Sequence, residues 1–231
     1  MDLFQSTRDA FHLLFSGDRE LWGIIFVSLR VSLTALAIVA PIAIVAGYFL
    51  ATKRFLGRRT IVIVIQGLLS FPTVVVGLVL YMLLSRQGPL GSLHMLFTPS
   101  AMILGQMMIV LPVLVAFTIS AVQGADPRAH DTAIGLGASR VRASLTVLWE
   151  VRFGVMAAIF NGFGRIISEV GAALMLGGNI AGLTRNIPTT IALETSKGEF
   201  AQGIALGFVL IALALGLNFT LARFQGEGGL K

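Results

Sequence analysis

The sequence contains no cysteine and few charged residues. Charged side chains make up 12% of its 231 residues, whereas a soluble domain of this size carries about a quarter. The absence of cysteine excludes disulfide frameworks and thiolate metal sites. Hydrophobic residues make up 56% of the chain, and the mean hydropathy is +0.89. The composition therefore predicts a membrane protein, and the net charge of +6 does not call for a nucleic-acid partner.

Sequence signatures of catalysis are also missing. The chain has no GxxxxGK[ST] phosphate loop and no HExxH motif. Its three histidines, His12, His94 and His130, are far apart in polar segments. We therefore expect neither an enzyme nor a nucleotide-driven motor, and no metal site or cofactor in this chain.

Five apolar segments are long enough to cross a bilayer core, which takes about 20 residues each. They lie within residues 22–51, 61–84, 99–121, 153–176 and 201–222. The predicted fold is an all-α, polytopic membrane bundle with five transmembrane helices in one domain, residues 21–231. Residues 1–20 form an amphipathic N-terminal tail, which is either a helix lying in the membrane interface or a frayed end. Its apolar residues fall on one helical face: Leu3, Phe4, Phe11, Leu14 and Phe15.

Basic residues predict the orientation of these spans. Ten would lie on one side: Lys53, Arg54, Arg58, Arg59, Arg128, Arg140, Arg142, Arg152, Arg223 and Lys231. Five would lie on the other: Arg8, Arg19, Arg86, Arg185 and Lys197. Since lysine and arginine collect on the cytoplasmic side, we expect the N-terminus outside and the C-terminus in the cytoplasm.

Several residues within the apolar segments have two interpretations. Pro41, Pro72 and Pro112 either bend helices around a translocation path or reflect the general tolerance of membrane helices for proline. Gly203 and Gly207 form a GxxxG pattern, which permits close helix contact but is common in glycine-rich membrane sequences.

Arg165 and Glu169 lie within the fourth apolar segment, four residues apart. On one continuous helix they would share a face and neutralise each other. An ionisable group at this depth indicates either a structural pair that holds helices together or a pair that lines a path for anions.

A polar segment, residues 121–152, separates the third and fourth apolar segments. Asp126 is expected to cap a short helix with Pro127 at its first position. That helix would stop at Gly137, and Ser139 would cap a second one. Such a basic, partly apolar corner predicts a surface that another protein grips.

This corner resembles the EAA loop of binding-protein-dependent ABC importer permeases. The family pattern reads E-A-A, three residues, G, nine residues, then I-x-L-P. Asp131, Ala133 and Gly137 match it or nearly match it, and Thr132 replaces an alanine. At the exit from the loop Val147 stands in for the isoleucine, while Trp149 and Glu150 replace the final leucine and proline.

Residues 164–203 are similar to the corresponding region of molybdate, sulfate and tungstate permeases, which reads approximately GEFGAT…AGNI-G-T. The residues in step are Glu169, Gly171, Gly178, Asn179, Ile180, Gly182 and Thr184. The stretch TTIALETSKGEF, with Glu194 and Lys197, is more similar to the tungstate branch.

The resemblance implies a type I ABC importer permease fold and a pore made by two copies of the chain. It implies a dimer of ATPase subunits, which bind ATP, at the cytoplasmic loop 121–152, through Asp131, Thr132, Ala133, Gly137, Ala138 and Arg140. It also implies a periplasmic or lipid-anchored oxyanion-binding protein at the outer loop, which contains Asn179, Thr184, Arg185 and Glu194. The location would be the cytoplasmic (inner) membrane of a bacterium or archaeon, among its lipids.

Tungstate is the substrate that the resemblance favours, with molybdate or sulfate as the alternative. A stand-alone secondary carrier or channel is the alternative from a different class. Carriers more usually show several acids at mid-depth or broken helices in paired halves.

Overall fold

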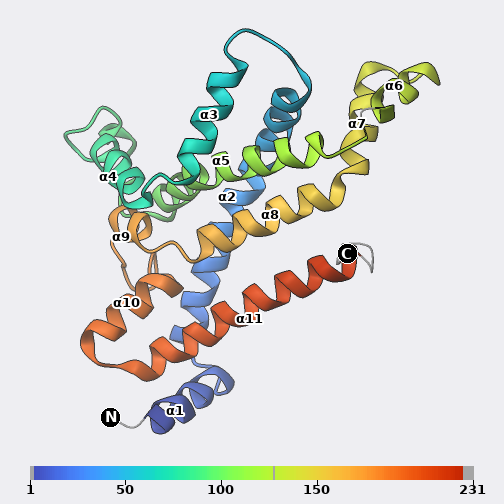
Figure 1. Cartoon of the computed structure of the whole chain (residues 1–231). Helices are drawn as coiled ribbons and strands as arrows, with labels where there is room; N and C mark the ends of the chain where they lie inside the picture. The colour runs from blue at the N-terminus through green and yellow to red at the C-terminus, as the bar shows by residue number, and fades with distance from the viewer. Residues whose placement is uncertain (1–2, 127, 226–231) are drawn as a thin grey trace. The chain divides into compact units, whose positions relative to one another are not determined.

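A computed structural model describes residues 3–126 and 128–225 of the chain. This described part is helical and contains no strand (Figure 1). Its elements are α1 (Leu3–Phe15), α2 (Arg19–Thr52), α3 (Arg58–Leu69), α4 (Thr73–Leu84), the 3-10 turn η1 (Gly91–Leu93), α5 (Pro99–Gln123), α6 (Arg128–Gly135), α7 (Arg140–Glu150), α8 (Arg152–Ile167), α9 (Gly171–Gly177), α10 (Ile187–Lys197) and α11 (Phe200–Gln225). The predicted all-α class is confirmed.

Three helices are long and apolar enough to cross a membrane by themselves: α2, α5 and α11. Two further candidates are bent pairs, α3 with α4 at 101° and α7 with α8 at 67°. The described residues therefore provide three spans, or up to five if each bent pair is one span.

Two of the expected spans are interrupted. Residues 61–84 do not form one helix: α3 ends at Leu69 and α4 begins at Thr73. Pro72 is the N-cap of α4, in the extended conformation that proline allows before a helix. Pro41 and Pro112, by contrast, lie inside α2 and α5, which continue through them. The expected segment 153–176 is also divided, because α8 ends at Ile167 and α9 begins at Gly171.

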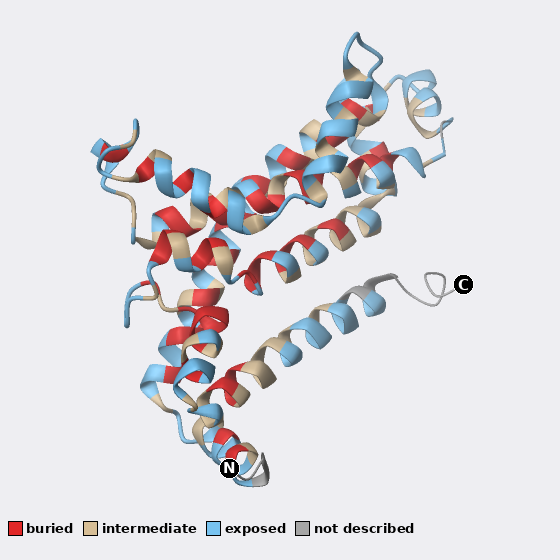
Figure 2. Ribbon diagram, turned by 60° about the vertical axis from the view of Figure 1, so that its left-hand side comes forward, coloured by how far each residue is buried: buried red, intermediate tan, exposed pale blue. Residues whose placement is uncertain are grey.

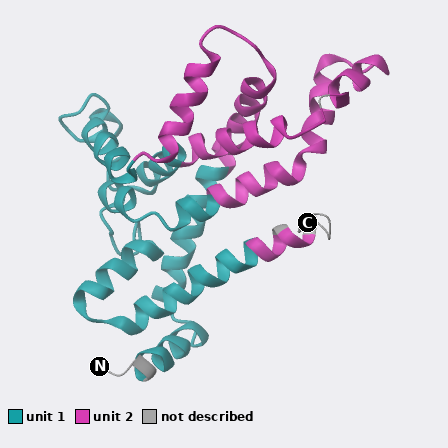
Figure 3. Cartoon of the chain, in the orientation of Figure 1, with its two compact units in different colours: residues 1–36, 72–109, 163–217 teal, residues 37–71, 110–162, 218–231 magenta. Residues whose placement is uncertain are grey.

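The chain forms two compact units (Figure 3). Unit 1 contains residues 1–36, 72–109 and 163–217, and unit 2 contains residues 37–71, 110–162 and 218–231.

One core of unit 1 joins α1, α2, α10 and the start of α11. Its fully buried side chains are Ala10, Leu21, Ile187, Ala205 and Leu206. In addition, the rings of Phe11 and Phe208 stack with their centroids 5.1 Å apart. Residues 3–15 of the N-terminal tail are thus helical and packed against their own chain, while the membrane interface expected for the tail stays a prediction.

The two short helices α4 and α9 pack closely in unit 1. A Cβ at Gly77 would lie 2.8 Å from Ala172 Cα, and one at Gly171 would lie 2.6 Å from Val74 Cγ2. Both contacts lie near the helix starts, so the two interrupted helices begin side by side. Small residues allow this approach.

Unit 2 packs the second half of α2 and the first part of α8 against α5. A Cβ at Gly47 would lie 2.7 Å from Thr118 Cβ, and one at Gly162 would lie 2.8 Å from Val110 Cγ2. Here too, glycines set the spacing of the helices.

The GxxxG pair of α11 makes no such approach within the described residues. A Cβ at Gly207 would meet nothing within 4 Å, and one at Gly203 would meet only Thr195 Oγ1, at 4.0 Å. Only 11% of the apolar window of α11 is buried in the chain, and Figure 2 shows the helix largely exposed.

Candidate functional site

The segment between α5 and α8 folds as the expected helix corner. Asp126 Oδ1 accepts a hydrogen bond from the Arg128 N–H at 2.9 Å, which caps α6. Pro127, expected at the first helical position, lies outside the described residues. Gly137 has φ +86°, and the N–H of Ala138 donates to the Ala133 carbonyl at 3.0 Å. Ser139 Oγ accepts from the Arg142 N–H at 3.4 Å and caps α7.

The residues expected to couple to an ATPase surround this corner. Asp131 and Thr132 are exposed on α6, and Ala133 and Ala138 are half-buried. Arg140 is the exposed first residue of α7. The side chain of Leu136, at the end of α6, is 84% exposed.

A hollow separates α6 from α7 in unit 2. Its volume is about 660 Å³, and Thr132, Ala133 and Ala138 line one part of it. Thr146 and Glu150 of α7 line another part. Three of the six expected coupling residues therefore meet at one cavity.

The expected outer loop contains a helix, α10, that sequence reasoning missed. Asn186 caps it: the Asn186 side chain accepts from the Thr189 N–H, and the Asn186 N–H donates to Thr189 Oγ1, both at 3.1 Å. Pro188 follows within the first turn. The sequence signal was present in the order Asn-Ile-Pro-Thr, which is typical of a helix start.

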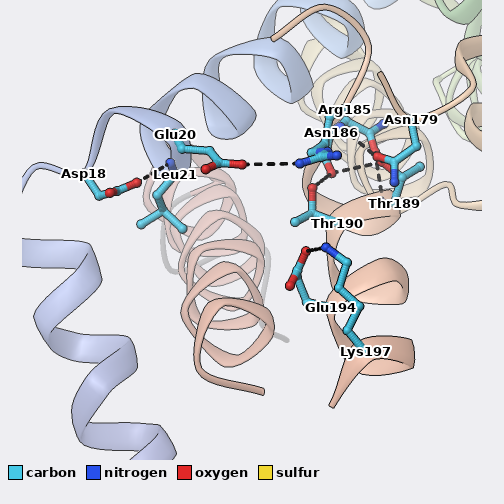
Figure 4. A network of polar contacts seen from close by, with 10 residues as sticks. All are labelled: Asp18, Glu20, Leu21, Asn179, Arg185, Asn186, Thr189, Thr190, Glu194 and Lys197. Atoms are coloured by element: carbon cyan, nitrogen blue, oxygen red, sulfur yellow. Dashed lines mark hydrogen bonds and ion pairs between the residues drawn. The ribbon is translucent and has the colours of Figure 1, made fainter. Parts of the chain in front are cut away.

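Asn179 and Thr184 are tied to this helix start and to the end of α9 (Figure 4 shows Asn179). Thr189 Oγ1 donates to Asn179 Oδ1 at 3.0 Å. Thr184 is fully buried, and its hydroxyl donates to the Gly177 carbonyl at 2.6 Å and accepts from the Ile180 N–H at 2.9 Å. The two predicted residues thus hold the turn between α9 and α10.

Two ion pairs flank this turn (Figure 4). Arg185 Nη1 lies 3.3 Å from Glu20 Oε1, at the start of α2. Glu194, on α10, is buried, and its carboxylate accepts from Lys197 Nζ at 2.9 Å. The N–H of Ile187 also donates to Ser28 Oγ of α2 at 2.7 Å. The four predicted outer residues therefore lie between the end of α9 and the end of α10, and the contacts of Arg185 and Ile187 anchor this region to α2.

Arg165 and Glu169 do not form the expected pair. Because α8 ends at Ile167, the two residues are not on one continuous helix face, and the ion pairs within the described residues do not join them. Arg165 is exposed in the chain, whereas Glu169 is buried and its Oε1 accepts from the Ala172 N–H at 3.1 Å. Glu169 therefore binds the first turn of α9. Gln106, which sequence reasoning missed, is buried on α5 and donates to the Ile166 carbonyl at 3.1 Å.

The fold is similar to that of solved ABC transporters. A chain of a bacterial ABC transporter involved in the import of the acidic polysaccharide alginate matches with a TM-score of 0.70 at 18% sequence identity. The match covers 93% of this chain and 83% of that one.

Curated relatives match over nearly the whole length, although no protein-family model does. A probable anion ABC transporter permease of Haloferax volcanii is 43% identical over 86% of this chain and 88% of its own. The tungstate uptake system permease TupB of Peptoclostridium acidaminophilum is 38% identical over 95% and 96%. The molybdenum transport permease ModB of Haemophilus influenzae is 31% identical over 88% and 96%. The chain belongs to the oxyanion permeases of ABC transporters.

Membership in this group accounts for the missing phosphate loop. An ABC permease is a multi-pass protein of the cytoplasmic membrane, and it works with ATPase and substrate-binding partners. The permease itself supplies apolar helices and surfaces for those partners.

Proposed function

We propose that this chain is the pore-forming subunit of an ABC importer for a tetrahedral oxyanion, with tungstate as its substrate. Two copies would form the pore, each with a type I permease fold and five spans, made by α2, by α3 with α4, by α5, by α8 with α9, and by α11. The observation that carries this function is the exposed α6–α7 corner on a chain similar to oxyanion permeases. Identity to the named relatives, 38% for tungstate against 31% for molybdenum, supports the choice of substrate.

The distribution of basic residues supports the proposed orientation. All ten residues expected in the cytoplasm belong to unit 2, and all five expected outside belong to unit 1. The ion pair of Glu20 with Arg185 also agrees with it, since both residues are expected outside. The N-terminus would then face outward, and the C-terminus and α6 would face the cytoplasm.

Force would enter through α6. Each ATPase subunit binds ATP and receives one α6–α7 corner, while this chain binds no cofactor and catalyses no reaction. Closure of the ATPase pair moves the two corners together and shifts the pore from an inward-open to an outward-open state. A binding protein delivers the oxyanion to the network around α10, which hydrogen bonds hold rigid in advance. The side-by-side starts of α4 and α9 support a path near these helix breaks, because interrupted membrane helices commonly line such paths.

A glycine replacement at the corner tests the coupling. Gly137 has φ +86°, which proline cannot adopt. Gly137→Pro should therefore disrupt the turn between α6 and α7 and leave the membrane spans intact. We expect ATP-driven tungstate uptake by proteoliposomes containing the partner ATPase and binding protein to fall to background. The matched control is Gly135→Ala, since Gly135 is helical and a Cβ there meets nothing within 4 Å.

Three outcomes would contradict the proposal. Normal uptake by a correctly inserted Gly137→Pro variant would remove α6 as the coupling element. Uptake driven by an ion gradient without ATP would favour a secondary carrier. If molybdate or sulfate binds the partner binding protein at a lower concentration than tungstate does, that anion and not tungstate is the substrate.

A further inference from the structure

Helix α7 presents an apolar stripe that the described part of the chain leaves uncovered. Val141, Leu145 and Trp149 are 70%, 58% and 71% exposed. They follow one another at intervals of four residues, so they lie along one side of the helix. Three large apolar side chains exposed in a row on a polar, short helix require a partner surface.

The stripe faces away from α6. Ala143 and Val147 are the buried residues of α7. At about 100° per residue, they lie about half a turn from the stripe. Glu150, which lines the hollow with α6, lies on the same side as Ala143, and Thr146, which also lines it, lies between this side and the stripe. Helix α6 therefore covers one side of α7, and the stripe is free on the other side.

The bend between α7 and α8 places α7 near the plane of a membrane. Helix α8 begins at Arg152 and is the first part of the proposed fourth span. The axis of α7 departs from that of α8 by 67°. Membrane helices tilt by about 20° on average from the bilayer normal, so α7 runs closer to the membrane surface than to the normal.

The side chains at the bend are those of a membrane–water interface. The Arg152 guanidinium lies over the Trp149 ring at 5.0 Å and over the Phe153 ring at 4.4 Å. Its Nη1 also donates to the Trp149 carbonyl at 2.8 Å. Tryptophan collects at headgroup level, and arginine reaches from apolar surroundings toward water there.

The charge around the stripe is complementary to acidic lipids. Arg140 and Arg142 are exposed in the first turn of α7, and Arg152 follows its end. Unit 2 as a whole contains ten basic and four acidic residues. The cytoplasmic leaflet is the anionic one in cells, and it attracts basic residues next to a membrane span.

We propose that α7 lies in the cytoplasmic interface of the bilayer. Its stripe of Val141, Leu145 and Trp149 packs on the acyl chains, and Arg142 and Arg152 bind the headgroups of acidic phospholipids. Helix α6 is then carried on the opposite side of α7, toward the cytoplasm, so the lipid surface supports the corner against the ATPase. This inference rests on the orientation given under the proposed function.

Tryptophan fluorescence tests the contact. The chain has two tryptophans, so Trp22→Phe leaves Trp149 as the reporter in the full-length permease. In nanodiscs of phosphatidylcholine and phosphatidylglycerol, lipid brominated near the headgroup end of its acyl chains should quench most of the Trp149 emission. Aqueous iodide should quench it little. The converse pattern, strong quenching by iodide and none by brominated lipid, would overturn the proposal.

Neutralising an arginine tests the lipid preference. The ratio of quenching by brominated phosphatidylglycerol to quenching by brominated phosphatidylcholine measures the relative binding of the acidic lipid. Arg142→Gln should lower this relative binding about fivefold, as expected for one basic residue at a membrane surface. Arg59→Gln is the matched control, because Arg59 is exposed at the start of α3 and should leave the ratio unchanged. An equal ratio for both lipids in the unaltered chain would refute the headgroup contact.

The partner ATPase provides the competing explanation. If the ATPase covers the stripe, adding it should protect Trp149 from iodide in nanodiscs where brominated lipid has no effect, and the lipid proposal fails. The uptake assay of Gly137→Pro is independent of this readout. Lipid contact without coupling at Gly137 would therefore reject only the proposed function, and coupling without lipid contact would reject only this inference.

Discussion

The two compact units differ in what their charged and polar groups do. Unit 1 contains seven basic and seven acidic residues, whereas unit 2 contains ten and four, so the entire net charge of +6 resides in unit 2. In unit 1, Thr184, Asn186, Thr189 and Glu194 are buried and hydrogen-bonded within the chain. In unit 2, the arginines of α6 and α7 are exposed.

This difference separates a preformed surface from an adaptable one. Buried, satisfied polar groups fix a unique local structure, because leaving any of them unpaired costs about 1–3 kcal/mol. Exposed arginines and large apolar side chains are the residue types that contribute most binding free energy when a partner covers them. Under the proposed function, unit 1 would receive a separate binding protein without rearrangement, while unit 2 would make repeated contact with a moving ATPase and with lipid.

The largest expected effect concerns the close packing of unit 1. Gly77→Ala puts a methyl group 2.8 Å from the Ala172 backbone, and backbone cannot yield as a flexible side chain can. We expect a loss of about 1–3 kcal/mol, as for other overpacked sites, measured as a lower midpoint of thermal unfolding in detergent.

Gly67→Ala is the matched control for this prediction. Gly67 lies in α3, and a Cβ there meets nothing within 4 Å, so alanine should leave the midpoint unchanged or raise it. Equal midpoints for the two variants would mean that α4 and α9 do not pack as tightly as the structure has them, and the contrast between the units would weaken.

A medium effect is expected at the break between α8 and α9. Glu169→Ala removes the acceptor of the Ala172 N–H and should cost about 1 kcal/mol, as for other helix caps. Arg165→Met should change stability by less than about 0.5 kcal/mol, because Arg165 is exposed. The double variant should show the sum of the two losses.

Transport by the same variants separates the two roles that the sequence left open. If Arg165→Met preserves the unfolding midpoint and lowers oxyanion uptake, Arg165 acts on the path. If a strong coupling appears in the double variant instead, the two residues interact after all, and the structural pair is restored.

The α6–α7 corner and the break between α8 and α9 show which parts of the structure could be predicted from the sequence. Local sequence signals were sufficient to predict the α6–α7 corner. Asp126 and Ser139 cap their helices through hydrogen bonds to residues two or three positions along the chain, and Gly137 has the positive φ expected of it. Apolar length was sufficient for α2, α5 and α11.

Long-range geometry was not accessible from the sequence. The prediction of an Arg165–Glu169 pair was wrong because it assumed a continuous helix, and no residue type between 164 and 171 marks the break as proline marks the one at Pro72. Helix α10 was missed although its start has a local signal, the capping box of Asn186 and Thr189, whereas its contact with Ser28, 159 residues away, was not accessible from the sequence. The exposure of the α7 stripe likewise depends on which face α6 covers.

The smallest expected effect concerns the ion pair between Glu20 and Arg185. Glu20 is 63% exposed and Arg185 is 19% exposed. The ion pair should therefore contribute about 0–1 kcal/mol to the free energy of unfolding, and this contribution should be smaller at high salt. A double-mutant cycle with Glu20→Gln and Arg185→Gln measures it by thermal unfolding at two salt concentrations. A coupling well above that range, insensitive to salt, would mean that water does not reach the pair. The start of α2 would then belong to the buried network around α10, and the preformed surface of unit 1 would extend across both helices.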